Sequence, residues 1–212
     1  ASLSALILSE IAREALPPGV FNIVTGTGAG VGAPLVRHPA VKRIAFIGSA
    51  GTGMAIQRMA AEVAVKHVTL ELGGKNPMIV FPDVDPQSII ASAIAGMNFS
   101  WQGQSCGSTS RLLLHESIYD EVVAGLVERI KAIRVGDPMD ETSQMGAINS
   151  KVQYDKVLNY IEMAKREGAT LLAGGQRPTG PGFEKGFWVR PTLFGDVTQD
   201  MRIANEEVFG PL

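Results

Sequence analysis

The sequence has only one cysteine, Cys106, and it lacks the features that mark several other classes of protein. A single thiol cannot form a disulfide within the chain, which is typical of a protein from a reducing compartment. The 19 basic residues are balanced by 21 acidic residues, so we expect no basic surface for nucleic acid. No apolar run is long enough to cross a membrane. We therefore expect a cytoplasmic protein with neither nucleic-acid nor membrane partners.

The 212 residues, 45% of them hydrophobic, are enough for one large globular domain or two small ones. The first residues are apolar but lack the basic segment that opens a signal peptide, and their spacing predicts a helix. The chain begins without Met inside this amphipathic pattern and stops in an apolar stretch, Val208 to Leu212. We expect it to be a fragment of a longer protein.

Predicted strands and helices alternate along the chain. The apolar pattern predicts strands at residues 20–24, 43–47 and 67–70, with helices at 3–15, 31–37 and 54–64. After Gly73-Gly74, the best candidate for a domain hinge, strands are expected at 77–81, 111–115 and 170–173, and helices from 86, over 117–133 and over 151–167. Ser117 is the expected N-cap of the middle helix. The alternation predicts an α/β fold with a parallel sheet.

Two glycine clusters compete as the site for cofactor phosphates. The first matches the dinucleotide pattern G-x-G-x-x-A from Gly28, but no Asp or Glu stands between residues 16 and 61 to hold a ribose. A tight turn before a helix is the simpler interpretation. The second cluster begins at Gly48, where a backbone can approach a ligand closely. Ser49 adds a hydroxyl beside the free N–H groups of a helix start, which together form an anion site.

Two residues are candidates for catalysis. Cys106 is flanked by glycine and small polar residues, a setting in which a thiolate can be reached by a substrate. A single Cys can equally be a small buried hydrophobic residue. Glu71 ends the strand predicted at 67–70, where α/β sheets hold their sites, so it is either a general base or a solvated strand-end carboxylate. From these neighbours alone both alternatives stay open.

Five segments, in order, resemble the aldehyde dehydrogenase superfamily, whose members oxidise aldehydes with NAD(P) through a cysteine thioester. They are LPPGVFN at residues 16–22, FIGSAGTG at 46–53, ELGGKNP at 71–77, GQSC at 103–106 and EEVFGP at 206–211. The resemblance covers essentially the whole chain. The ELGGK and GQSC pair is its most specific part.

Carried over residue by residue, the resemblance implies a catalytic pair and a set of cofactor contacts. Cys106 is implied to be the nucleophile, and Glu71 the general base that activates water for hydrolysis of the thioester. The turn and helix start that receive the cofactor pyrophosphate correspond to Gly48, Ser49 and Gly53. The nicotinamide end is implied to contact Leu72, Gly73, Glu207 and Phe209, of which Glu207 holds the ribose. The cofactor is NAD or NADP, and no metal is implied.

The resemblance also implies how the chain is divided. Residues 1–71 correspond to the C-terminal half of a Rossmann-like cofactor domain, and residues 72–212 to most of the α/β catalytic domain. The Asn that helps stabilise the oxyanion in the family, the Lys-Pro-x-Glu stretch that biases NAD against NADP, and the oligomerisation strands have no counterpart in this sequence. We therefore expect the 212-residue chain alone to be weakly active or inactive, and the full-length protein to be a homodimer or homotetramer.

Three questions stay open at this point. A CoA-acylating relative would pass the acyl group to CoA, although the water-activating Glu71 favours hydrolysis. A non-catalytic structural relative is a second alternative. The presence of Cys106, Glu71 and Glu207 together argues against it. The substrate is the third: Trp101 replaces the Asn usual five residues before the nucleophile, and it either shapes the aldehyde pocket or fills the core. We lean toward a betaine-aldehyde-type or broad-specificity enzyme.

Overall fold

The computed structural model describes residues 2–212, which form two compact units. The first, unit 1, ends at Gly73, and the second, unit 2, runs from Gly74 to Leu212. Each unit contains parallel strands connected through helices, so the predicted α/β class is confirmed. The units are described separately below.

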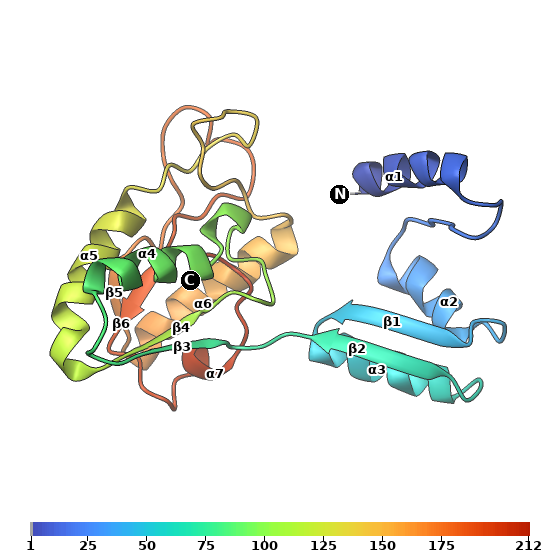
Figure 1. The fold of residues 1–212 in the computed structure, drawn as a ribbon, viewed down its shortest axis with the longest axis horizontal. Coiled ribbons are helices and arrows are strands. Elements are labelled where there is room, and N and C mark those ends of the chain that lie inside the picture. The colour runs from blue at the N-terminus through green and yellow to red at the C-terminus, as the bar shows by residue number, and fades with distance from the viewer. Residues whose placement is uncertain (1) are drawn as a thin grey trace. The chain divides into compact units, whose positions relative to one another are not determined.

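Unit 1 is built around one strand–helix–strand motif. Strand β1 (Arg43–Gly48) pairs in parallel with β2 (His67–Leu72), and α3 (Ala50–Ala61) connects them. Figure 1 shows the two strands side by side with α3 along one face. A small core of Val36, Ile56 and Ala60 joins this helix to its neighbour α2 (Ala33–Arg37). The parallel register brings the carboxyl ends of both strands to the same edge.

The N-terminal part of unit 1 differs from the prediction. Helix α1 (Ser2–Ala15) forms as expected but buries none of its residues. The prediction of a strand at residues 20–24 is wrong: this segment has no regular secondary structure and pairs with no strand in the described chain. A β-propensity pattern yields a strand only where a partner completes the backbone hydrogen bonds. The helix predicted at 31–37 begins as a π-helical turn, Gly28–Gly32, which the Thr27 hydroxyl caps, and then continues as α2.

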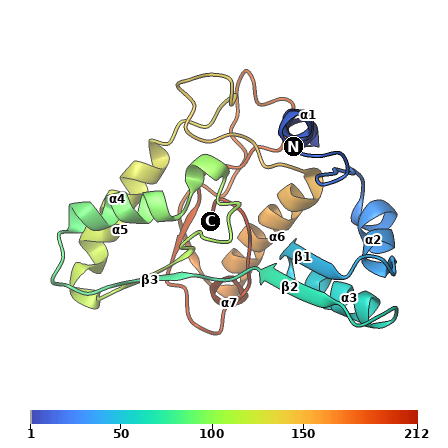
Figure 2. The same ribbon diagram turned by 45° about the vertical axis from the view of Figure 1, so that its right-hand side comes forward.

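Unit 2 contains two small sheets and four α-helices among the described residues. β3 (Pro77–Val80) pairs in parallel with β4 (Arg111–Leu114), and β5 (Thr170–Ala173) pairs antiparallel with β6 (Leu193–Gly195). The helices are α4 (Pro86–Gly96), α5 (Tyr119–Lys131), α6 (Lys151–Glu167) and α7 (Arg202–Asn205). Short 3-10 turns lie at Phe99–Trp101 and Glu116–Ile118. Figure 2 shows α4 and α5 side by side, as in Figure 1.

Polar caps set where these helices begin. Asp85 accepts hydrogen bonds from the backbone N–H and the hydroxyl of Ser88 at 2.8 and 2.7 Å, which fixes the start of α4. Ser150 caps α6 by accepting the backbone N–H of Gln153 at 3.3 Å, and the bounds of this helix match those predicted, 151–167. The prediction that Ser117 caps α5 is wrong. His115 Nδ1 accepts the N–H of Ser117, so the cap starts a 3-10 turn and α5 begins only at Tyr119.

The core of unit 2 has two clusters. One joins α4 to α5, where Ile90 packs so closely on Gly125 that a Cβ there would overlap it. The other surrounds α6, whose Val157 and Ile161 are fully buried. A Cβ on Gly210 would overlap Val157, so this second cluster also supports the segment at the C-terminal end of the chain. One face of α6 is therefore buried in the core of unit 2.

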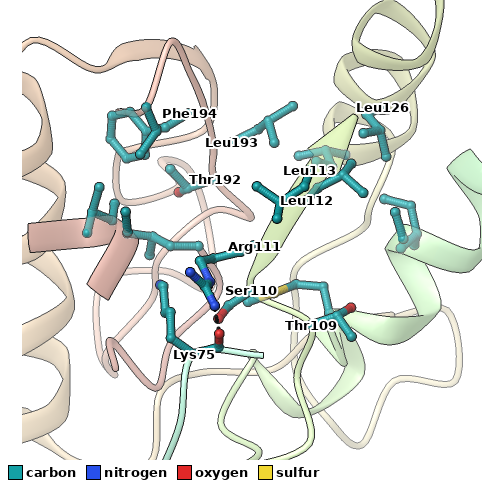
Figure 3. Close-up of a pocket in the computed structure, with 18 of the residues that line it drawn as sticks. Lys75, Thr109, Ser110, Arg111, Leu112, Leu113, Leu126, Thr192, Leu193 and Phe194 are labelled. Atoms are coloured by element: carbon teal, nitrogen blue, oxygen red, sulfur yellow. Dashed lines mark hydrogen bonds between the residues drawn. The ribbon is translucent and has the colours of Figure 1, made fainter. Parts of the chain in front are cut away.

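A cavity of about 170 Å³ lies beside the first cluster, and most of its lining is apolar. Figure 3 shows Lys75 and Arg111 at one end and the leucines of β4 and β6 at the other. Arg111 Nε donates to the carbonyl of Lys75 at 2.9 Å. Burial, with the positive charge of Arg111 as a second cause, lowers the pKa of the Lys75 ammonium from 10.5 to about 8.

We expect Val157→Ala to destabilise unit 2 by about 2–3 kcal/mol, because it removes two methyl groups from a site with no exposed surface. Val152→Ala on the same helix is the matched control, since Val152 is 81% exposed and its loss should change stability by less than about 0.5 kcal/mol. Urea unfolding followed by circular dichroism measures both. Equal effects of the two substitutions would contradict the packing described for α6.

We expect Lys75→Met to stabilise the protein at pH 7 by up to about 2 kcal/mol, because the folded state then no longer holds a partly buried charge. The folded pKa lies near 8 and the unfolded value is 10.5, so the unfolded chain binds more protons between these values. The wild-type penalty therefore shrinks as the pH rises through that window. Thermal melts from pH 7 to 10.5 measure the difference, with exposed Lys131→Met as control. A gain that does not change with pH would contradict this origin.

Candidate active site

Cys106 lies in a loop that leaves α4 and returns to β4, and left-handed backbone shapes this loop. Asn98 and Gln102 both adopt φ of 56°, and Gly103 adopts 63°. Gly103 is also buried against the chain at Gly210, whose carbonyl oxygen a Cβ would overlap. Only glycine satisfies both the backbone angle and the close approach. The GQSC motif therefore begins with a residue that the geometry requires.

Asn76 anchors the loop at the thiol-bearing residue and two residues after it. Its side-chain amide donates to the carbonyl of Cys106 at 2.6 Å and to the carbonyl of Ser108 at 3.2 Å. Ser108 is itself buried, and its hydroxyl donates to the carbonyl of Met97 at 3.0 Å. The backbone around Cys106 is thus held from the segment that precedes β3. Asn76 closes the ELGGKN run, but no role for it was predicted from the sequence.

A second anchor joins the loop to the segment before α6. The Gln104 amide donates to Asn149 Oδ1 at 2.9 Å, and its own carbonyl oxygen accepts the backbone N–H of Asn149 at 3.2 Å. The pair therefore uses both ends of the Gln104 amide. This explains a Gln at the second position of GQSC, because neither a shorter nor a charged side chain offers the same donor and acceptor.

The thiol of Cys106 is exposed and forms no disulfide. The backbone N–H groups that follow it are occupied: that of Gly107 donates to the Ser105 hydroxyl at 3.2 Å and that of Ser108 to the Ser105 carbonyl at 3.1 Å. By contrast, the N–H of Cys106 has no acceptor within residues 2–212. A free donor beside a reachable sulfur is the arrangement that a developing oxyanion requires.

The EEVFGP segment lies against the same loop. Glu207, Phe209 and Gly210 line a small cleft with Gly103 and Ser105. The backbone N–H of Gly74 donates to Glu207 Oε1 at 3.3 Å. Structure thus brings together three motifs that are far apart in the sequence, those around Gly74, Cys106 and Glu207.

Phe209 is held in a left-handed conformation, with φ of 58°. Gln153 of α6 donates from its amide to the carbonyl of Val208 at 2.8 Å and to that of Phe209 at 2.7 Å. Such a conformation costs free energy in a residue with a Cβ, and the two hydrogen bonds from a buried helix offset that cost. Gln153 is a second residue that sequence reasoning missed, because no local motif marks it.

In unit 1 the predicted phosphate turn lies between β1 and α3. Ser49 caps α3 and accepts the N–H of Thr52 at 3.3 Å, while the N–H groups of Ala50 and Gly51 have no acceptor in residues 2–212. Gly53 is buried, and a Cβ there would approach Leu72 at 2.9 Å. The glycine therefore lets the helix pack closely on β2, and the helix start keeps free donors for an anion.

The remaining predicted residues of unit 1 lie at the carboxyl edge of its two strands. Glu71 is opposite Ile47 and Leu72 is opposite Gly48, so Gly48, Glu71 and Leu72 share one edge with the phosphate turn. Glu71 and Gly73 are exposed. Trp101, in unit 2, is 64% exposed and therefore fills no core within residues 2–212.

Residues 2–212 contain neither a candidate metal site nor a candidate membrane span. No group of three or more His, Cys, Asp or Glu side chains is placed to hold a metal ion. No described helix is both long and apolar enough to span a bilayer.

Comparison with known proteins places this geometry in one family. The model of the aldehyde dehydrogenase family matches residues 1–212. The chain is 50% identical to the aldehyde dehydrogenase tropH of Talaromyces stipitatus over 216 residues, which is 100% of this chain and 42% of that protein. It is also 50% identical to the betaine aldehyde dehydrogenase of Brucella anthropi, covering 99% of this chain and 43% of that protein. The chain thus spans less than half the length of these relatives.

Solved structures of aldehyde dehydrogenases also superpose closely on this chain. An aldehyde dehydrogenase from Bacillus cereus, described as an NAD+ complex, superposes with a TM-score of 0.93 at 44% identity, covering 99% of this chain and 42% of that one. A betaine aldehyde dehydrogenase variant from Staphylococcus aureus, also with NAD+, gives a TM-score of 0.94 at 36% identity, with the same coverage. On the match over its full length and the residues that surround Cys106, the chain belongs to the aldehyde dehydrogenase family.

Proposed function

We propose that this chain is the central part of an NAD(P)-dependent aldehyde dehydrogenase that oxidises an aldehyde to a carboxylic acid. One observation carries the proposal: Cys106 is exposed, its backbone N–H is free, and its loop is anchored beside Glu207. A nucleophile, an oxyanion donor and a carboxylate that can accept from a ribose are the parts that this chemistry needs.

The first step is attack by the Cys106 thiolate on the carbonyl carbon of the aldehyde. The carbonyl oxygen becomes negatively charged, and the free N–H of Cys106 stabilises it. The second step leaves a thioester on the sulfur once the carbon has lost a hydride. Glu71 then takes a proton from water, which attacks the acyl carbon and releases the acid and the thiolate.

NAD(P), when bound, accepts the hydride that the tetrahedral adduct loses. The residues present fit such a group: the N–H groups at the start of α3, with Gly48 and Ser49, suit a pyrophosphate. Glu207 keeps one carboxylate oxygen free for ribose hydroxyls, because only Oε1 accepts from Gly74. Leu72, Gly73 and Phe209 complete the proposed nicotinamide contacts. Gly53 serves the site by letting α3 pack on β2.

The two units correspond in this proposal to the two predicted domains. Residues 1–71 provide the second half of the cofactor-binding domain, and residues 72–212 most of the catalytic domain. The full-length protein would act in the cytoplasm as a homodimer or homotetramer. A betaine-aldehyde-type substrate is favoured by the relatives from Brucella, which carry that name at 50% identity.

We expect Cys106→Ser in the full-length enzyme to lower the rate of aldehyde oxidation at least about 10³-fold, because the hydroxyl is a far weaker nucleophile. Glu71→Gln should lower steady-state turnover about 10²–10⁴-fold but leave a burst of one NADH per active site, since hydride leaves before water attacks. Stopped-flow absorbance at 340 nm separates the two. Loss of the burst in Glu71→Gln would contradict a role confined to hydrolysis.

The same preparation decides between water and CoA as acyl acceptor. With excess aldehyde and CoA, the hydrolytic enzyme gives free acid, whereas a CoA-acylating enzyme gives acyl-CoA, and liquid chromatography quantifies both. Iodoacetamide labelling of Cys106 with and without NAD tests the non-catalytic alternative. An unreactive thiol under both conditions would favour a structural protein.

We expect the 212-residue chain, expressed alone, to turn over aldehyde at least about 10²-fold more slowly than the full-length enzyme, because it lacks much of the protein that would enclose the reacting groups. A side-by-side assay of both polypeptides at equal concentration measures the ratio. A rate typical of the family from the short chain would show that residues 1–212 suffice.

A further inference from the structure

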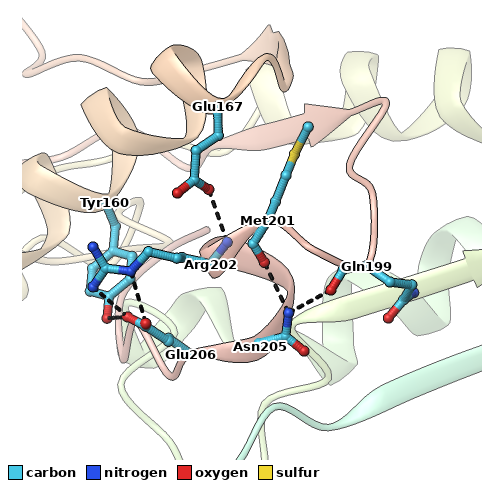
Figure 4. A network of polar contacts seen from close by, with 7 residues as sticks. All are labelled: Tyr160, Glu167, Gln199, Met201, Arg202, Asn205 and Glu206. Atoms are coloured by element: carbon cyan, nitrogen blue, oxygen red, sulfur yellow. Dashed lines mark hydrogen bonds and ion pairs between the residues drawn. The ribbon is translucent and has the colours of Figure 1, made fainter.

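A polar cluster joins α6 to α7 directly before the proposed ribose ligand, Glu207. Three hydrogen bonds converge on the Glu206 carboxylate: Arg202 Nε and Nη2 donate at 2.8 and 2.9 Å, and the Tyr160 hydroxyl donates at 2.6 Å. Figure 4 shows the Arg202 guanidinium and the Tyr160 ring meeting at this carboxylate. The planar fork of arginine and a third donor from another helix leave Glu206 one preferred orientation.

Arg202 is itself fixed at the start of α7. Its backbone N–H donates to Glu167 Oε2 at 2.9 Å, at the end of α6. At the other end of α7, the backbone N–H of Glu206 donates to the carbonyl of Arg202 at 2.8 Å. Arg202, the first residue of α7, and Glu206, directly after its last residue, are therefore each bonded to α6 and to one another.

The charges of this cluster do not change near neutral pH. Hydrogen bonds from Arg202 and Tyr160 lower the pKa of Glu206 to about 2. Burial, with the bond to Glu206 as a second cause, raises the pKa of Tyr160 to about 12. Glu206 therefore stays ionised and Tyr160 keeps its proton, so their hydrogen bond persists across the pH range in which enzymes are assayed.

Glu207 lies between two fixed points. On one side Glu206 is held by Tyr160 and Arg202, at the point where the chain leaves α7. On the other side Val208 is buried in the α6 core, and its carbonyl accepts from Gln153. With the residues before and after it fixed, the backbone of Glu207 has little freedom, and its carboxylate is directed to the cleft beside Gly74.

We propose that Tyr160 and Arg202 are positioning residues for cofactor binding, which hold Glu206 and thereby aim Glu207 at the ribose of the nicotinamide half. The inference rests on the proposed function, since it assumes that Glu207 binds that ribose. It assigns neither residue a contact with cofactor or substrate. If it holds, replacing either residue lowers the affinity for NAD but leaves the affinity for the adenosine half of the cofactor unchanged.

The test uses the full-length enzyme and isothermal titration with NAD and, separately, with AMP. Tyr160→Phe deletes one hydrogen bond to Glu206 and should raise the Kd for NAD three- to tenfold, with the Kd for AMP unchanged within twofold. Arg202→Met should do the same. Tyr154→Phe is the matched control, because Tyr154 is on the same helix and its hydroxyl has no hydrogen-bond partner in residues 2–212.

A double-mutant cycle separates positioning from general stabilisation. Because Tyr160 is argued to act through Glu207, adding Tyr160→Phe to Glu207→Gln should weaken NAD binding no further. Three results would overturn the inference while the wild-type enzyme still binds NAD. The substitutions could weaken the binding of NAD and of AMP equally, or the effects of Tyr160→Phe and Glu207→Gln on NAD binding could be fully additive. The third is an unchanged Kd for NAD in both Tyr160→Phe and Arg202→Met. A wild-type enzyme that does not bind NAD would instead overturn the proposed function and, with it, the inference.

Discussion

The close approach of Gly103 to Gly210 is the constraint on which the site in unit 2 depends. The two backbones touch where any side chain at position 103 would overlap the carbonyl of residue 210. Gly210 in turn packs on Val157 of α6, so the nucleophile loop is supported, through the segment at Gly210, by a buried helix. The left-handed backbone angle at position 103 and the tight contact there both require glycine.

Hydrogen bonds from amide side chains hold the other segments of the site together. Asn76, Gln104 and Gln153 each make two hydrogen bonds, and each joins segments that are distant in the sequence. A neutral amide offers both donors and acceptors without a charge to desolvate, so it can hold main-chain groups in a partly buried place at little cost. The loop that carries Cys106 and the segment that follows Glu207 are thereby anchored by neutral side chains.

Much of this could be predicted from the sequence, and the exceptions have physical reasons. The helices over 151–167 and from Pro86 follow from local caps and apolar periodicity, which are properties of neighbouring residues. The catalytic and cofactor motifs were recognised by their resemblance to a family. The strand at 20–24 failed because a strand needs a partner, and pairing is not a local property. Asn76, Gln153 and Tyr160 were missed for the same reason: their partners lie 30 to 56 positions away.

The anchoring of the loop around Cys106 has a consequence for how such an enzyme diversifies. The contacts from Asn76 go to the carbonyls of Cys106 and Ser108, and the contact of Gly103 is with the carbonyl of Gly210. Main-chain groups are the same whatever side chain is attached, and Trp101 holds the loop only through its backbone N–H and carbonyl, while its side chain is exposed. Side chains that meet the aldehyde can therefore be exchanged while the sulfur keeps its place, so that a change of substrate need not disturb the chemistry.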